Sequence, residues 1–166
     1  ELNGSPVLPM TVHGTGSVAG GSLDIDASAS SQFVSALLLA APLMTHGLDL
    51  RHVGETLPSQ PHIAMTVAVL REAGIDVVEQ PVDAPNRWIV SPNIPQLSDV
   101  TIEPDLSNAG AFLAAAMVSG GRVSIPRWPS QTTQPGDAYR EIFTEMGATV
   151  TLDDGLLTVV GPGAIR

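Results

Sequence analysis

The 166-residue chain contains no cysteine, and all seven of its basic residues are arginines, so it contains no lysine. Without cysteine it can form no disulfide, no thiolate metal site and no thiol nucleophile. Its formal net charge of −10, with 17 acidic residues, disfavours nucleic acid and anionic membrane surfaces as partners, because the field of the whole molecule repels them. A site for an anion in this chain must therefore rely largely on hydroxyl, amide and backbone N–H groups.

Aromatic residues and long apolar runs are also scarce. Aromatics make up 4% of the chain, so the core of a sequence that is 43% hydrophobic must consist mainly of Ala, Val, Leu and Ile. The longest apolar run, Phe33 to Met44, is too short to cross a bilayer and contains Pro42. No signal peptide is visible, so we expect a soluble cytoplasmic protein. Because the chain begins at Glu1 rather than Met, we also expect a fragment of a longer protein.

One structural unit is repeated along the chain. The hydrophobic pattern predicts a βαβαββ order in each of two copies, so the expected fold class is α/β. The elements predicted for the first copy are strand 22–25, helix 31–44, strand 48–53, helix 62–73, strand 75–79 and strand 87–90. Those predicted for the second copy are strand 100–102, helix 109–118, strand 122–125, helix 137–146 and a hairpin formed by 148–152 and 156–160.

Two prolines mark the boundary between the copies. We assign residues 1–98 to the first unit and 99–166 to the second, with a hinge near 91–105. The first helix of each copy is apolar on every face, which is typical of a helix that is buried on all sides. Two copies cannot easily enclose both of these helices. We therefore expect further copies outside this chain, and self-association of the isolated chain.

Ser30, Ser31 and Gln32 lie at the start of the first apolar helix. The first backbone N–H groups of a helix lack intrahelical partners, and the helix dipole places partial positive charge there. Two hydroxyls and one amide at this point predict a phosphate site that needs no cation. The alternative is that these residues simply cap the helix, as in most serine-rich helix starts.

Ser59 precedes the second helix of the first copy. Its hydroxyl could cap that helix or contact a ligand, and both interpretations stay open. Both helix starts should lie at the same end of the sheet. That geometry would let Ser59 and the turn formed by Ser30, Ser31 and Gln32 converge on one ligand.

Glu103 and Asp105 are paired carboxylates at the corresponding turn of the second copy. They could form a catalytic acid–base pair, but we favour helix capping and stabilisation of the hinge, because Pro104 stiffens this turn. Asp137 is predicted to cap the next helix. The four histidines show no metal-ligand spacing, so we expect no metal site and place all four at the surface or in loops, namely His13, His46, His52 and His62.

The chain resembles the 5-enolpyruvylshikimate-3-phosphate (EPSP) synthases over nearly its whole length. The resemblance is carried, in order, by Ser-Ser-Gln-Phe at 30–33, Leu-Pro-Ser-Gln-Pro-His-Ile at 57–63, Glu-Pro-Asp at 103–105 and Phe-Leu-Ala-Ala-Ala at 112–116. It implies the two-lobed inside-out barrel of the enolpyruvyl transferases, built from βαβαββ units, of which two are present here. It also implies transfer of the enolpyruvyl group of phosphoenolpyruvate to the 5-hydroxyl of shikimate 3-phosphate, a step of aromatic amino acid biosynthesis whose enzyme is the target of glyphosate.

By the same resemblance, Ser30, Ser31 and Ser59 hold the phosphate of shikimate 3-phosphate, and Gln32 contacts both this substrate and phosphoenolpyruvate. The acids, bases and cationic clamps of the reaction would lie outside this chain. We therefore expect no catalytic residue and no cofactor here, an inactive isolated chain and a monomeric full enzyme. His62 stands where many relatives carry tyrosine. Two other interpretations stay open: a non-catalytic repeat module that binds an anionic ligand or a protein, and a different enolpyruvyl transferase.

Overall fold

The computed structural model describes residues 10–79 and 86–163, and its contacts divide the chain between Gln96 and Leu97. Within the described residues, the two units, Glu1–Gln96 and Leu97–Arg166, each contain one β-sheet and two α-helices, so the fold is of mixed α/β class. Each unit has a hydrophobic core of its own.

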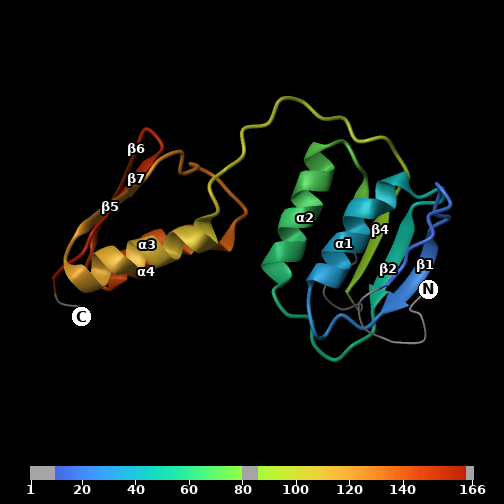
Figure 1. Cartoon of the computed structure of the whole chain (residues 1–166), viewed down its shortest axis with the longest axis horizontal. Coiled ribbons are helices and arrows are strands. Elements are labelled where there is room, and N and C mark those ends of the chain that lie inside the picture. The colour runs from blue at the N-terminus through green and yellow to red at the C-terminus, as the bar shows by residue number, and fades with distance from the viewer. Residues whose placement is uncertain (1–9, 80–85, 164–166) are drawn as a thin grey trace. The chain divides into compact units, whose positions relative to one another are not determined.

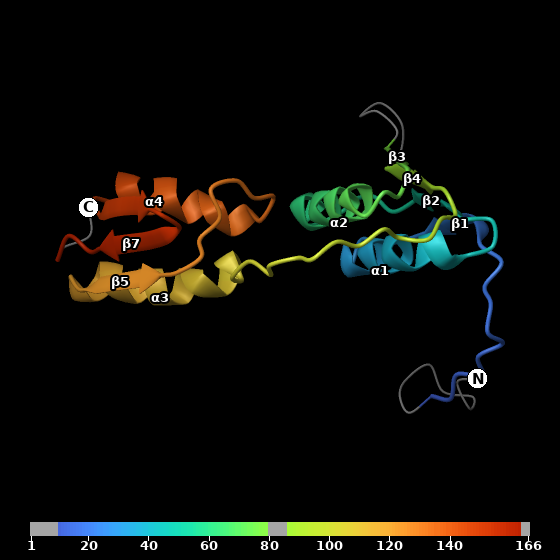
Figure 2. The same cartoon turned by 90° about the horizontal axis from the view of Figure 1, so that it is seen from above.

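The first unit has the predicted βαβαββ order. Its strands form a sheet in the order β1-β2-β4-β3, in which β1 and β2 are parallel and the other neighbours are antiparallel. Helices α1 and α2 lie side by side against this sheet (Figures 1 and 2). The elements are β1 (Gly21–Ile25), α1 (Gln32–Ala40), β2 (Leu48–His52), α2 (Gln60–Glu72), β3 (Val77–Glu79) and β4 (Arg87–Val90).

Strand β2 shows how this sheet separates its two faces. Successive side chains of a strand point to opposite sides, and alternate residues Leu48, Leu50 and His52 are buried. On the other face Asp49 pairs with Arg87, with 2.6 Å between Oδ2 and a guanidinium nitrogen. The hydrogen bonds from Arg87 lower the pKa of Asp49. The helices therefore cover the apolar face, and the opposite face carries paired charges.

Helix α1 is shorter than predicted. It ends at Ala40 and continues as one turn of 3₁₀-helix, η1 (Ala41–Leu43), because Pro42 cannot donate a backbone hydrogen bond. Val34 and Leu38 are buried, whereas Phe33 is 53% exposed and Leu39 is 54% exposed. Within the described residues, this apolar helix is thus covered on one face and open on the other.

The second unit lacks its predicted first strand. Residues 100–102 form no strand in the described structure, and Ile102 is 76% exposed. A strand needs a hydrogen-bonded neighbour, and this segment pairs with no strand of the described sheet, in which β5 is an edge. The elements are α3 (Leu106–Ser119), β5 (Arg122–Ile125), η2 (Pro135–Ala138), α4 (Tyr139–Glu145), β6 (Thr149–Asp153) and β7 (Leu156–Val160), with sheet order β5-β7-β6.

The hairpin of the second unit follows the prediction closely. Strands β6 and β7 are joined by Asp154 and Gly155, whose φ angles are 43° and 72°. Positive φ at both central residues is the requirement of a type I′ turn, whose twist matches that of the strands it connects. The Asp-Gly pair therefore sets the register of this hairpin.

The open face of α1 gives a matched test of the fold. Leu38→Ala should lower the free energy of unfolding of the chain by about 2–5 kcal/mol, because it empties a fully buried site. The same substitution at the neighbouring Leu39 should change it by less than about 0.5 kcal/mol. Both values come from denaturant unfolding followed by circular dichroism. Equal losses at the two positions would contradict the placement of this helix.

Candidate functional site

The parallel pairing of β1 with β2 brings two helix starts to one edge of the sheet. Helix α1 follows the carboxyl end of β1, and α2 follows the carboxyl end of β2, so both helices begin at the same end of the unit (Figure 1). Near these starts, the Thr66 hydroxyl of α2 is 2.9 Å from the Ser35 hydroxyl of α1. The positive ends of two helix dipoles therefore share one edge.

A short hydrogen-bonded turn connects β1 to α1. The backbone N–H of Ser30 donates to the carbonyl of Ala27 at 3.1 Å, and that of Gln32 donates to the Ser30 hydroxyl oxygen at 3.2 Å. Earlier in the turn, the N–H of Ser28 donates to a carboxylate oxygen of Asp26 at 2.9 Å. Hydrogen bonding by Ser28, chiefly through its side chain, lowers the pKa of Asp26. Polar groups of the turn itself therefore contribute to its order.

The serines of the turn differ in how their hydroxyls are used. Ser30 accepts a local bond from Gln32, which is the capping behaviour of small polar residues. Ser31 occupies the N-cap position of α1 but makes no capping hydrogen bond through its side chain, although it is only 5% exposed. Gln32 is the first residue of α1 and is exposed. The hydroxyl of Ser31 is thus not committed to its own helix.

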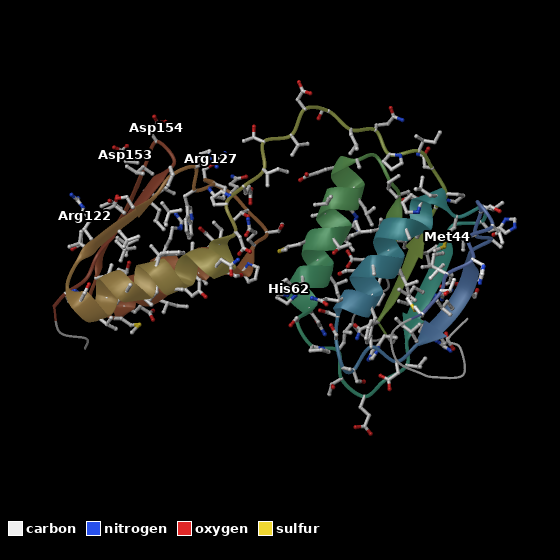
Figure 3. All side chains as sticks on the ribbon, in the orientation of Figure 1. Met44, His62, Arg122, Arg127, Asp153 and Asp154 are labelled. Atoms are coloured by element: carbon white, nitrogen blue, oxygen red, sulfur yellow. The ribbon has the colours of Figure 1, made fainter. Side chains whose placement is uncertain are left out.

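Ser59 occupies the N-cap position of α2 and also makes no capping hydrogen bond through its side chain. Its backbone is left-handed, with φ 51° and ψ 43°, a conformation that costs a residue with a Cβ atom about 1–2 kcal/mol. The residue is exposed, and Pro61 follows in the first turn of the helix. His62 is exposed near the same start (Figure 3). Capping does not account for the hydroxyl of Ser59.

The paired carboxylates of the second unit have structural partners. Asp105 is the N-cap of α3 and accepts from the backbone N–H of Asn108 at 2.9 Å, which confirms the capping interpretation. Glu103 accepts from the Thr132 hydroxyl and from the Gln134 side-chain amide, each at 2.8 Å. Both carboxylates therefore have hydrogen-bond partners at the start of α3, as the capping interpretation predicts for Asp105.

The prediction that Asp137 caps a helix is wrong. It lies inside η2, and the N-cap residues are Gln134 for η2 and Ala138 for α4. The Asp137 carboxylate instead accepts from the indole N–H of Trp128 at 2.8 Å and pairs with Arg140 at 2.9 Å. A buried indole needs an acceptor, and this requirement determined the role of Asp137.

The predicted location of one histidine is wrong. His52 was expected at the surface or in a loop, but it is 3% exposed at the end of β2, where Nδ1 accepts from the backbone N–H of Ala27 at 3.1 Å. The signal that could have found it is the alternation of Leu48, Leu50 and His52 on one face of a strand. This residue therefore supports the turn that leads to Ser30.

Among the described residues, no group of three or more His, Cys, Asp or Glu side chains could hold a metal ion. No helix in the same part of the chain is long and apolar enough to cross a membrane. What this edge of the first unit offers a ligand is hydroxyl, amide and backbone N–H groups at two helix starts. In mixed α/β proteins such helix starts are common sites of phosphate binding.

Comparison with known proteins identifies the family. Residues 2–166 match the family model described as EPSP synthase (3-phosphoshikimate 1-carboxyvinyltransferase), and the chain belongs to this family. It is 55% identical over 164 residues to a protein from Kocuria rhizophila named 3-phosphoshikimate 1-carboxyvinyltransferase. The matched region covers 98% of this chain and 36% of that protein. A protein of the same name from Mycobacterium ulcerans is 52% identical over 159 residues, or 96% of the chain and 36% of that protein. The chain thus spans about 36% of the length of these relatives.

Solved structures give a much weaker similarity. Two structures of EPSP synthase from Acinetobacter baumannii match with a TM-score of 0.29 and 16% sequence identity. The matches cover 81% and 80% of this chain and 32% of each solved chain. The family assignment rests on the sequence matches and not on this structural similarity.

The left-handed backbone of Ser59 yields a stability test. Ser59→Gly should raise the free energy of unfolding by about 0.5–1 kcal/mol, because glycine adopts this conformation without the Cβ penalty. The matched control Ala64→Gly, at an exposed position inside the same helix, should lower it by about 1 kcal/mol. Denaturant unfolding measures both, and a loss of stability in Ser59→Gly would show that Ser59 does not hold this conformation in solution.

Proposed function

We propose that this chain forms part of an enzyme that transfers the enolpyruvyl group of phosphoenolpyruvate to the 5-hydroxyl of shikimate 3-phosphate. In this proposal the edge formed by the starts of α1 and α2 binds the phosphate group of shikimate 3-phosphate. The family match and the names of the relatives support the reaction. The observation that carries the site is that the hydroxyls of Ser31 and Ser59 stand at two adjacent helix starts and cap neither helix.

Each proposed contact has a distinct physical role. The hydroxyls of Ser30, Ser31 and Ser59 donate to phosphate oxygens, and the positive ends of the two helix dipoles favour the dianion. Gln32 is exposed beside them, and its amide reaches both shikimate 3-phosphate and phosphoenolpyruvate. Hydrogen bonds to a charged group are about twice as strong as those between neutral groups. Four uncharged side chains can therefore contribute substantially to binding in a chain without lysine.

The chemistry itself needs more than this site contains. The substrate 5-hydroxyl adds to C2 of phosphoenolpyruvate, C3 is protonated, and phosphate then leaves from the tetrahedral intermediate. These steps require general acids and bases and cationic groups around two phosphates and a carboxylate. We propose that such groups come from parts of the enzyme outside this chain, which contributes substrate binding.

The two units have separate places in this proposal. Residues 1–98 belong to one lobe of an inside-out barrel and residues 99–166 begin the other, with a hinge near 91–105. The open apolar faces of α1 and α3 support this arrangement, since Phe33 and Phe112 are both more than half exposed. Further units of the same kind would cover these faces in the full enzyme, which we propose to be a monomer. Without that cover, an isolated chain is proposed to self-associate.

The phosphate site is tested by titration of the intact gene product with shikimate 3-phosphate. Ser31→Ala and Gln32→Ala should each weaken binding by about tenfold to a hundredfold, because each removes a hydrogen bond to a charged group. The control Ser107→Ala changes an exposed serine in the first turn of α3 and should bind like the parent. Isothermal titration calorimetry gives the dissociation constants.

Two results would count against this site. Unchanged affinity in Ser31→Ala and Gln32→Ala would place the phosphate elsewhere. Protection by a nucleotide-sugar substrate in place of shikimate 3-phosphate, measured as a rise in melting temperature, would indicate a different enolpyruvyl transferase.

An activity assay on the isolated chain tests the proposal that this chain binds substrate and that the catalytic groups lie outside it. With both substrates present, the chain should release no phosphate above background, because the acids and bases of the reaction are proposed to lie elsewhere. The intact gene product serves as the positive control in the same assay. Turnover by the isolated chain would show that catalytic groups are present among its own 166 residues.

A further inference from the structure

His52 is fixed at the carboxyl end of β2, directly beside the turn that leads to α1. Its backbone N–H donates to the carbonyl of Asn86 at 2.9 Å, and the next N–H, that of Val53, donates to the carbonyl of Ile25 at the end of β1. The side chain is 3% exposed and lies on the same face of β2 as Leu48 and Leu50. Its position is therefore set by the sheet and not by the turn.

The imidazole is bound to the turn through one nitrogen. Nδ1 accepts from the backbone N–H of Ala27 at 3.1 Å, so Nδ1 carries no proton in this arrangement. The other nitrogen, Nε2, is buried and has no hydrogen-bond partner among the described residues. Within that part of the chain, the hydrogen bond that the ring makes is thus the one to Ala27.

From Ala27 a series of hydrogen bonds runs to the first residue of α1. The carbonyl of Ala27 accepts from the N–H of Ser30 at 3.1 Å, and the Ser30 hydroxyl accepts from the N–H of Gln32 at 3.2 Å. Ala27 itself is fully buried, so its N–H has no access to water as an alternative partner. The His52 ring is therefore connected to Gln32 by three successive hydrogen bonds.

Gly54 shows how closely the chain is packed at this point. A Cβ atom placed on Gly54 would lie 2.1 Å from the Ser28 hydroxyl oxygen, 2.2 Å from a carboxylate oxygen of Asp26 and 2.6 Å from Cε1 of His52. All three distances are shorter than real Cβ contacts. The ring, the Asp26 carboxylate and the Ser28 hydroxyl thus converge on a position that has room for glycine alone.

We propose that His52 is a positioning residue for the substrate-binding turn, in which its Nδ1 holds the N–H of Ala27 and thereby sets where Ser30, Ser31 and Gln32 stand. This inference rests on the proposed function, since it assigns a purpose to the turn. A ligand group must be held to within a fraction of an ångström by residues that are themselves fixed, and His52 supplies that support from the sheet. Without an acceptor at this point, the buried N–H of Ala27 must find another partner, and the turn moves with it.

The test compares three substitutions at this position in the intact gene product. His52→Asn keeps an oxygen acceptor close to the place of Nδ1. His52→Gln moves the acceptor one bond further out, and His52→Leu removes it at similar volume. We expect His52→Leu and His52→Gln to weaken binding of shikimate 3-phosphate by about tenfold, and His52→Asn to stay within about threefold of the parent. Calorimetry gives the affinity, and thermal unfolding is measured in parallel.

The rank order of the three variants in affinity distinguishes a positioning role of His52 from a role in packing alone. If His52 serves packing alone, all three variants lose stability without rescue of affinity by Asn, and the inference is overturned. Unchanged affinity in all three overturns it as well. If His52→Leu does not fold, the comparison of Asn with Gln decides in the same way.

Ser31→Ala, measured beside these variants, distinguishes failure of the inference from failure of the proposed function. A loss of affinity in Ser31→Ala with none in His52→Leu or His52→Gln rejects the positioning role and keeps the site. Full affinity in Ser31→Ala rejects the site itself, and with it the role of His52.

Discussion

The parallel pairing of β1 with β2 is the constraint on which the site depends. Two adjacent parallel strands deliver their chains to the same edge, so the helices that follow them must begin side by side. Had these strands been antiparallel, the starts of α1 and α2 would lie at opposite ends of the sheet. Ser31 and Ser59, which are 28 residues apart in sequence, are brought to one edge by this pairing and by the contact between Thr66 and Ser35.

The net charge of −10 gives this chain an electrostatic field that repels anions. Whether an anion can bind therefore depends on the charged and polar groups close to the site. In the first unit the two closest ion pairs, Asp49 with Arg87 and Asp24 with Arg51, lie on the sheet face away from the helices. Two carboxylates and two guanidinium groups are thus neutralised in pairs on that face. The helix starts are left with hydroxyls and N–H groups, whose partial charges act at short range where the ligand would sit.

Much of this arrangement can be predicted from the sequence, because the residue patterns that determine strands and turns are local. Strands 87–90 and 122–125 have the predicted bounds, and the type I′ turn follows from Asp154 and Gly155. What the sequence could not supply are roles that depend on a distant partner. The role of Asp137 depended on the indole of Trp128, and the contact of His52 with the backbone N–H of Ala27 joins residues 25 apart in sequence. A strand at 100–102 would need a neighbour, and its residues carry no sign of whether one is present.

The two units begin their first helices in chemically opposite ways, and this difference favours the start of α1 over that of α3 as the proposed phosphate site. At α3 the Asp105 carboxylate already accepts the N–H of Asn108, and the Glu103 carboxylate lies close by in the same segment. A second anion at that point would meet two negative charges. At α1 the corresponding positions hold the neutral residues Ser30, Ser31 and Gln32, and the nearest carboxylate of the turn, Asp26, is engaged by Ser28. A repeated architecture thus provides two helix starts, and the side chains at each decide which of them is open to an anion.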